Sequence, residues 1–488
     1  MKDLTFASAT EQADAIRDRQ VSAVELLDAH LARIEQHNPT LNAIVTLDMD
    51  RARKRAKEAD EAQAQGEFWG LLHGVPVTIK DAIATEGIRT TGGFEPLAEY
   101  VPAEDAPVVA RLKAAGAIVV GKTNLPVLSR DFQCENPIFG RSNNPWDLER
   151  TPGGSTGGGA AAIAAGLSPL ELGSDIGGSV RIPAHFCGIY SLKPTEHRVP
   201  TTGHIPDLPD LPRAVRHMNT IGPLTRSLDD LDLAIRLISG PDGWEIEVPP
   251  VPLASIPTPG PGELRLAWAD QFGSVPVTRD TAAAIRKLAE NLESAGATVE
   301  QTLPPGLDFE TLWETHGALI HAERASTMSQ EEEAAYLRER GLDPDNLDPD
   351  SDNPMERGMA KAANASIRDF AAILNRRDAQ IQILERFFDE FDALLCPVTA
   401  TPAIRHCPRN TPIDVDGQPV AYWSAGGGYT GPFNLTGHPA VIVPLTRSAE
   451  GLPIGLQIVG PRWSEMKILA IARALEPFVQ GYQRPPGY

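Results

Sequence analysis

The spacing of apolar residues predicts helices in the first part of the chain. Ser22-Ala-Val-Glu25 has the form of a capping box, and apolar residues at helical spacing follow it through Leu26–His37. We expect this N-terminal helical region to cover about 8–37 and 50–65. From Gly74 onward the pattern changes, because short apolar runs begin to alternate with helical stretches.

This alternation continues to the end of the chain without an internal repeat. Caps, glycine stops and apolar spacing predict a helix at 105–116, a strand at 117–121, a helix start at 160–166, a strand at 170–173, an amphipathic helix at 280–296 followed by a strand, and a long helix at 362–391.

Two segments lack such periodicity. The proline-rich stretch 241–262 indicates an excursion between two halves of one domain. The acidic stretch 329–357 contains Asp343-Pro-Asp-Asn-Leu-Asp-Pro-Asp, which could imitate a calcium loop. Its prolines and its missing glycine and glutamate positions instead favour a mobile surface loop.

The composition of the chain indicates which binding partners and which cellular compartment are expected. A formal net charge of −21 argues against nucleic acid and against anionic membranes. No apolar run is long enough to span a bilayer, and the first residues lack the apolar core of a signal peptide. Neither the histidines nor the cysteines have metal-ligand spacing, so we expect no metal and no cofactor. The lack of a signal-peptide pattern predicts a cytoplasmic protein. Its four cysteines are interpreted as reduced thiols: Cys134, Cys187, Cys396 and Cys407.

Two serines framed by glycines, together with one lysine, carry the candidate chemistry. Ser155 lies in Thr151-Pro-Gly-Gly-Ser-Thr-Gly-Gly-Gly, Ser179 lies in Gly-Ser-Asp-Ile-Gly-Gly-Ser, and Lys80 ends an apolar run. A serine hydroxyl needs a base to become nucleophilic, and burial can keep a lysine neutral enough to serve as that base. The N–H groups of Ile176-Gly177-Gly178-Ser179 are suited to stabilising an oxyanion. These are the parts of a Ser–Ser–Lys hydrolase.

Other interpretations of the same residues explain less. Gly153-Gly-Ser-Thr-Gly157 also fits the nucleophile elbow of α/β-hydrolases, but the preceding segment is polar and broken by prolines. Packing of a helix against a sheet would account for Gly157–Gly159, yet not for two serines and a lysine. Spacing alone does not exclude a Ser-His-Asp triad. Three histidines near the motifs are interpreted as structural: His73, His185 and His438.

These motifs resemble the amidase signature hydrolases. The resemblance rests on Gly74-Val-Pro-Val-Thr-Ile-Lys-Asp, on Gly-Gly-Ser at 153–155 and on Gly-Ser-Asp-Ile-Gly-Gly-Ser-Val-Arg-Ile-Pro at 173–183. Flanking matches include Gly222-Pro-Leu-Thr-Arg and Gly451-Leu-Pro-Ile-Gly-Leu-Gln-Ile-Val-Gly. The resemblance implies an α/β fold in which residues 1–488 form a single amidase domain, with a mixed central β-sheet covered by helices on both faces. Its parts would be a helical region at about 1–70, a signature core at about 71–240, the excursion at 241–262 and a remainder that completes the domain.

The resemblance also implies the roles of individual residues. Ser179 would be the nucleophile, Ser155, preceded by a cis peptide, would relay its proton, and Lys80 would be the final base. Asp175 and Arg181 would form an ion pair that holds the glycine loop. The chain departs from the usual family pattern at two positions, but both replacements keep a hydroxyl: Thr156 and Ser174.

The sequence predicts the type of bond that is cleaved, an amide bond, more clearly than it predicts the substrate. Amides are expected as substrates, with esters and carbamates (a urethanase activity) as additional ones, and relatives suggest a homodimer. Aromatic residues beside glycines predict a flexible, largely apolar rim that favours aryl or alkyl amides. The alternative is the glutaminase component of a tRNA-dependent amidotransferase, although the segment 358–370 does not match its glutamine-binding context. The expected pocket walls are Phe132, Gln133, Cys134, Trp313, Tyr422, Trp423 and Tyr429.

Overall fold

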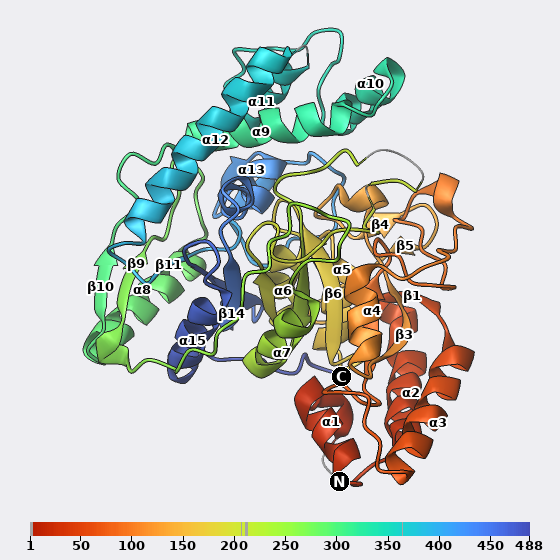
Figure 1. Cartoon of the computed structure of the whole chain (residues 1–488). Helices are drawn as coiled ribbons and strands as arrows, with labels where there is room; N and C mark the ends of the chain where they lie inside the picture. The colour runs from red at the N-terminus through yellow and green to blue at the C-terminus, as the bar shows by residue number, and fades with distance from the viewer. Residues whose placement is uncertain (1–2, 206, 210–212, 364) are drawn as a thin grey trace.

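A mixed sheet of 11 strands forms the centre of the molecule (Figure 1). The computed structural model describes residues 3–205, 207–209, 213–363 and 365–488. Pairs β3/β2, β2/β6, β11/β9 and β9/β10 are parallel, and the other neighbours are antiparallel. The order across the sheet is β1 (Ile44–Leu47), β3 (Ile118–Thr123), β2 (Pro76–Lys80), β6 (Leu170–Asp175), β8 (Thr220–Thr225), β7 (Tyr190–Lys193), β14 (Ala440–Arg447), β15 (Pro453–Val459), β11 (Ala393–Cys396), β9 (Arg265–Trp268) and β10 (Thr298–Gln301).

Helices pack on both faces of this sheet, which confirms the predicted α/β class. The apolar core on one face is closed by α4 (Pro107–Ala114), α7 (Leu228–Ile238), α8 (Arg279–Ser294) and α15 (Glu465–Leu475). The opposite face is covered by α2 (Ala23–Leu41), α3 (Met49–Ala64), α5 (Gly157–Ala164) and α6 (Arg181–Cys187). Among the described residues, no helix is both long enough and apolar enough to cross a bilayer.

The remaining elements lie around these layers. Two hairpins are formed by β4 (Glu135–Asn136) with β5 (Gly140–Arg141), and by β12 (Ile413–Val415) with β13 (Gln418–Val420). Short helices are α1 (Ala9–Arg17), α13 (Tyr422–Gly427), α14 (Gly431–Leu435) and the single 3-10 turns Leu4–Phe6, Glu95–Leu97, Val127–Ser129, Pro261–Glu263 and Glu476–Phe478.

The alternation of side chains along β2 decides which way Lys80 points. Val77 and Ile79 belong to the core beneath α4 and α7. Since successive side chains of a strand point to opposite faces, Thr78 and Lys80 face α5 and α6 instead. The two serine-bearing loops precede these same helices. The register of β2 therefore directs the lysine toward the serines.

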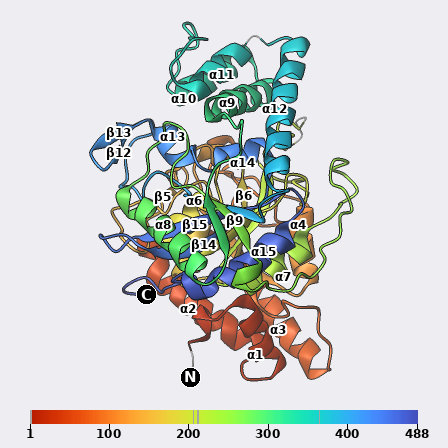
Figure 2. The ribbon, with the colours of Figure 1, turned by 90° about the vertical axis from the view of Figure 1, so that its left-hand side faces the viewer.

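A group of helices between β10 and β11 rises above the sheet (Figures 1 and 2). Helices α9 and α11 contact each other most extensively, and α12 crosses α9. Both β10 and β11 pair with β9, so this segment, residues 302–392, leaves the sheet and returns to it beside the same strand. Its helices are α9 (Phe309–Ala325), α10 (Gln330–Glu339), α11 (Pro354–Ala362) and α12 (Ile367–Phe387).

Most predicted elements are present with shifted ends. The region 8–65 forms α1, α2 and α3, with β1 as an additional strand, and 280–296 and 362–391 correspond to α8 and α12, although residue 364 lies outside the described residues. The helix expected at 160–166 already begins at Gly157. In its first turn, a Cβ on Gly159 would lie 2.6 Å from the Glu171 side chain, so small residues are needed there.

The prediction of a loop at 329–357 was wrong for much of its length. Helix α10 occupies its first part, where Ser329 and Glu332 form a capping box. Tyr336 and Leu337 on that helix are buried in a small core with Met359. Acidic composition dominated the prediction, whereas the cap and these two apolar contacts determine the local structure. The stretch 241–262, by contrast, contains no helix or strand other than the start of one 3-10 turn.

Candidate active site

Lys80 lies at the end of β2 and is completely buried. Its Nζ donates to Ser155 Oγ at 2.6 Å and to Ser174 Oγ at 2.9 Å. Strands β2 and β6 are parallel neighbours, so their carboxyl ends bring Lys80 and Ser174 to the same edge of the sheet. Burial lowers the pKa of Lys80 to about 7, although Asp175 opposes this effect. A large fraction of this amine is therefore neutral near pH 7.

The two serine loops lie against each other. The peptide bond from Gly154 to Ser155 is cis. The backbone N–H of Thr156, the next residue, donates to the carbonyl of Ser179 at 3.1 Å. Ser155 is completely buried, while Ser179 is slightly exposed and borders a cavity. Within the described ranges, the hydroxyls of the two serines do not share a hydrogen bond. Lys80 is hydrogen-bonded to Ser155, and Ser179 lies in the loop next to Ser155.

Asp175 and Arg181 form a buried, two-pronged ion pair beneath the Ser179 loop. Arg181 Nη2 donates to Asp175 Oδ1 at 3.0 Å and Nε donates to Oδ2 at 3.1 Å. Burial alone would raise the pKa of Asp175, but the Arg181 guanidinium outweighs it and holds that pKa well below its usual range. Asn434 Nδ2 donates to the same carboxylate at 2.8 Å, and Gln457 Oε1 accepts from Arg181 at 2.7 Å.

The ion pair also determines which backbone N–H groups remain free. Gly178, whose φ of 123° suits glycine, donates its N–H to Asp175 Oδ1 at 2.8 Å. Of the four N–H groups proposed for the oxyanion, this one is therefore already engaged. Among the described residues, the N–H groups of Ile176, Gly177 and Ser179 have no acceptor. These three are the donors available to an anion beside Ser179.

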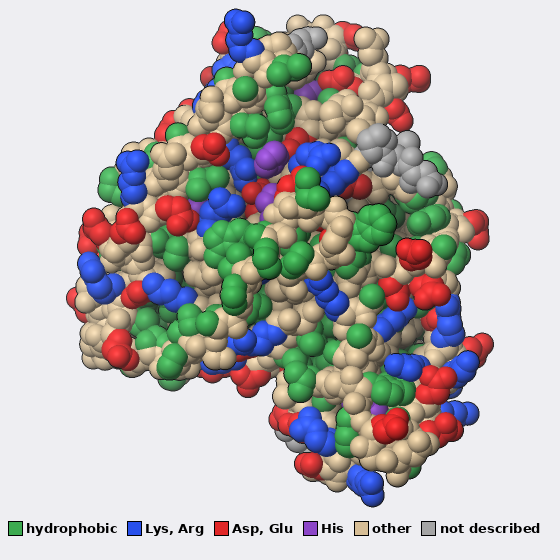
Figure 3. Space-filling view, viewed as in Figure 1, with side chains coloured by type: hydrophobic (Ala, Val, Ile, Leu, Met, Phe, Trp, Pro, Cys, Tyr) green, Lys and Arg blue, Asp and Glu red, His purple; other side chains and the backbone are tan. Residues whose placement is uncertain are grey.

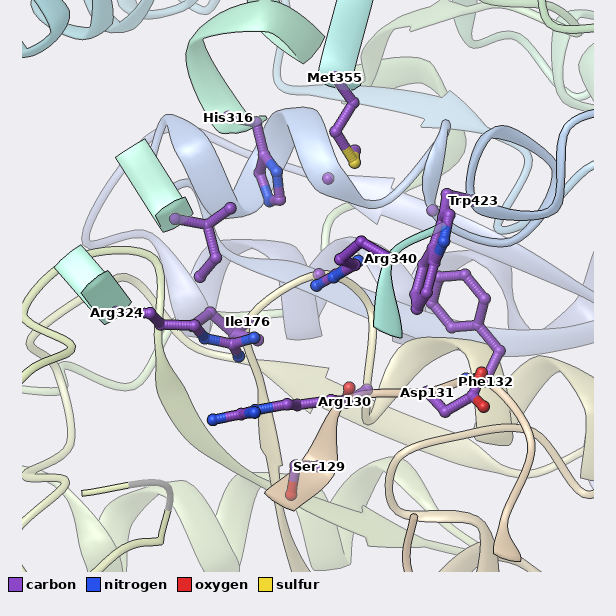
Figure 4. Close-up of a pocket in the computed structure, with 15 residues that line it drawn as sticks. Ser129, Arg130, Asp131, Phe132, Ile176, His316, Arg324, Arg340, Met355 and Trp423 are labelled. Carbon is purple, nitrogen blue, oxygen red and sulfur yellow. Dashed lines mark hydrogen bonds between the residues drawn. The ribbon is translucent and has the colours of Figure 1, made fainter. Parts of the chain in front are cut away.

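A small cavity of about 50 Å³ opens above Ser179. Figure 3 shows basic and histidine side chains gathered in the hollow beneath the helical group of residues 302–392, and Figure 4 shows the cavity itself. Burial lowers the pKa of His316 to about 4, so this ring is neutral at pH 7. The cavity is lined by Ser129, Arg130, Asp131, Phe132, Ile176, Gly177, Ser179, His316, Ile320, Arg324, Arg340, Met355, Trp423, Gly427 and Gly431.

The walls of this cavity differ from those predicted. Phe132 and Trp423 do line it, with ring centroids 4.9 Å apart. Three arginines also line it, so the lining carries charged groups that the sequence did not predict, although most of its surface is apolar. The other expected wall residues lie elsewhere: Gln133 beside Cys407, Cys134 buried beneath the first turn of α5, and Trp313, Tyr422 and Tyr429 in the apolar core.

Several residues at the site were missed by sequence reasoning. Gln457 lies within the quoted motif at 451–460, and Arg130 lies two positions before Phe132, so position alone could have suggested both. Arg324, Arg340 and Met355 come from the segment 302–392, which carries no family motif quoted above. Only the tertiary structure brings them to the cavity.

With this geometry in place, comparisons identify the family. The model of the family named Amidase matches residues 25–469. The chain belongs to the amidase signature family. Accordingly, this amidase is a hydrolase that acts on carbon–nitrogen bonds.

Relatives of this amidase include proteins with different substrates. It is 36% identical to an indoleacetamide hydrolase of Bradyrhizobium diazoefficiens over 96% of this chain and 86% of that protein. It is 32% identical to a component of the glutamyl-tRNA(Gln) amidotransferase of Moorella thermoacetica, over 99% of both chains. A bacterial aryl acylamidase has a similar structure, with a TM-score of 0.81 and 27% identity over 99% of both chains.

Proposed function

We propose that this amidase cleaves carboxylic amides through an acyl-enzyme on Ser179, with Ser155 as relay and Lys80 as base. The observation that carries the proposal is a completely buried lysine, with a pKa near 7, 2.6 Å from the hydroxyl of Ser155. A base with a pKa near the working pH is well matched to proton transfer. Ser155 in turn belongs to a loop in direct contact with the Ser179 loop.

The proposed reaction has two halves. As Ser179 Oγ attacks the amide carbon, its proton passes to Ser155, whose own proton passes to neutral Lys80. The oxyanion accepts hydrogen bonds from the free N–H groups of Ile176, Gly177 and Ser179. The C–N bond then breaks, and the Lys80 ammonium returns its proton through Ser155 to the leaving amine. Water attacks the resulting ester by the same route and releases the carboxylic acid.

The same chemistry extends to esters and carbamates, because both place a carbonyl carbon beside a leaving group. Alkyl and aryl amides remain the proposed substrates, and a homodimer and a cytoplasmic location remain part of the proposal. All four cysteines are unpaired thiols, which fits a reducing compartment.

The glutaminase component of an amidotransferase is the second candidate. It is favoured by the 32% identity to the Moorella thermoacetica amidotransferase component over 99% of both chains. Such a protein would act on glutamine and pass ammonia to a partner. A stand-alone amidase would not need that partner.

The test is the release of ammonia from glutamine and hexanamide, of aniline from acetanilide, and of the phenol from an aryl ester and an aryl carbamate. Wild type would be compared with Ser179→Ala, which should lose at least about 1,000-fold in kcat because it removes the nucleophile. Thermal unfolding would check that this variant keeps its fold. Near wild-type rates in Ser179→Ala would refute the assignment, and turnover of glutamine alone would select the amidotransferase function.

A further inference from the structure

Three arginines from separate segments line the cavity above Ser179. Arg130 follows a 3-10 turn, Arg324 lies in the last turn of α9, and Arg340 caps the end of α10. In Figure 4 their side chains extend toward the same space. The cavity that contains the nucleophile therefore also contains three guanidinium groups.

Among the residues that the structure describes, carboxylates do not balance this charge. Within the described part of the chain, Arg324 and Arg340 form no ion pair. Arg130 has one, to Glu339 at 3.7 Å, and that half-exposed carboxylate also meets Arg409 at 3.6 Å. In addition, the buried Nε atoms of Arg130 and Arg324 lack any hydrogen-bond partner among the described residues. Unpaired buried donors of this kind are costly unless a ligand satisfies them.

The other acidic side chains around the arginines are already engaged. Asp131 accepts from Tyr422 at 2.6 Å and from Arg409 at 3.0 Å. Arg130 and Arg324 also border a neighbouring cavity of about 220 Å³, where Asp207 and Glu332 are found. Asp207 accepts from two backbone N–H groups, and Glu332 caps α10.

Aromatic rings hold the guanidinium groups in place. The ring centroid of buried Tyr336 lies 5.2 Å from Arg130, 5.6 Å from Arg324 and 5.7 Å from Arg340. Arg340 also stacks on Trp423 at 4.1 Å. These cation–π contacts position the cations without neutralising them. Burial would raise the pKa of Tyr336, but the three arginines together lower it to about 8.

We infer that Arg130, Arg324 and Arg340 bind a carboxylate group of the substrate, so that the natural substrate is an amide that also carries a free carboxylate. This inference rests on the proposed function, since it places the amide at Ser179 and the carboxylate at the arginines of the same cavity. Guanidinium groups pair with carboxylates in a planar, two-pronged geometry.

The same surroundings disfavour a substrate with a free ammonium group beside the carboxylate. Asp131, the acidic side chain that lines the cavity, is paired with Arg409 and Tyr422. An α-ammonium group would therefore meet three cations, with no unpaired carboxylate among the described residues that line the cavity. Glutaramate, which is glutamine without its ammonium group, should be the better substrate of the two.

Matched substrate pairs test the inference. Ammonia release would be compared for glutaramate and hexanamide, and release of the arylamine for 4-acetamidobenzoate and acetanilide. These pairs place the carboxylate on the acyl side and on the leaving group, respectively. In wild type, kcat/KM should be at least about 10-fold higher for the carboxylate member of one pair.

Variants then assign that preference to the arginines. Arg324→Gln and Arg340→Gln should each lower the ratio of kcat/KM for the carboxylate member over its neutral partner by about 10- to 100-fold. Arg338→Gln is the matched control, because Arg338 is exposed on α10 and does not line the cavity. Its ratio should remain that of wild type.

The outcomes separate the two proposals. Ser179-dependent turnover of the neutral amides without preference for the carboxylate members would overturn the inference and leave the amidase function intact. Absence of any Ser179-dependent turnover would overturn both. Should the arginine variants not fold, glutaramate should raise the Tm of Ser179→Ala while hexanamide should not, and equal effects would count against the inference.

Discussion

Lys80 illustrates how the fold changes the chemistry of one side chain. In water its amine would be charged at pH 7, but complete burial lowers its pKa from 10.5 to about 7. The folded state therefore binds fewer protons than the unfolded chain between these two values. As pH falls through this range, the shift therefore lowers the stability of the folded state. The same shift leaves the Lys80 amine partly neutral near pH 7, as the proposed role of a base requires.

This shift predicts the pH dependence of the reaction. Because the base must be neutral, kcat/KM should rise about 10-fold per pH unit below pH 7 and level off above it. Initial rates between pH 5 and 9, on a substrate whose charge does not change in that range, would measure this. Tm values over the same range would exclude unfolding as the cause. A profile that stayed flat down to pH 5 would contradict a lysine base.

Two helices of the segment 302–392 cross at unusually short range. A Cβ on Gly358 of α11 would lie 2.0 Å from the Glu314 carbonyl of α9, and one on Gly317 would lie 2.2 Å from the Met355 carbonyl. Glycine is required here because the backbones are in contact. Both helices contribute residues to the cavity, so their separation affects the shape of the cavity beside Ser179.

Gly358→Ala should force these helices apart. We expect KM to rise by about 10-fold and Tm to fall, because the cavity walls move while the Lys80–Ser155 pair, which lies at the end of β2, does not. Steady-state kinetics and thermal unfolding would measure both effects. Gly262→Ala is the control, since its nearest neighbouring atom would be 3.8 Å away. An unchanged KM in Gly358→Ala would show that the crossing does not shape the site.

The residues that the segment 302–392 contributes to the cavity could not be predicted from the sequence. Lys80, Ser155 and Ser179 could be found because glycines and a buried strand end leave a local pattern around them. Arg324 and Arg340 leave none, since each is an ordinary charged residue until α9 and α10 are placed above Ser179. Tyr422 and Tyr429 were assigned to the pocket for the converse reason, because aromatic residues beside glycines have the same sequence pattern in a pocket wall and in a core.

At the scale of the whole molecule, Arg226 joins the N-terminal region to the sheet. Its buried guanidinium donates to the carbonyls of Thr5 at 3.0 Å and Ala7 at 2.7 Å. It also donates to those of Ile163 at 2.9 Å and Ser168 at 2.7 Å, at the end of α5. One side chain therefore connects the start of the chain with the helix that follows Ser155.

Arg226→Met should destabilise the protein by about 3 kcal/mol, because it leaves several buried carbonyls without donors. Thermal unfolding would show a lower Tm, and limited proteolysis would show faster cleavage near the N-terminus. Arg279→Met, at a side chain that is 88% exposed, should change neither. Equal Tm values for the two variants would refute the anchoring role.

The segment 302–392 is flanked by β10 and β11, which both pair with β9, and this arrangement has an evolutionary consequence. His316, Ile320, Arg324, Arg340 and Met355 all lie in that one segment, whereas Lys80, Ser155 and Ser179 lie in another. Recombination at the two strand ends could exchange these cavity residues together and leave the proposed catalytic residues unchanged. Relatives that share the motifs could thus diverge in substrate by replacing a single stretch of gene.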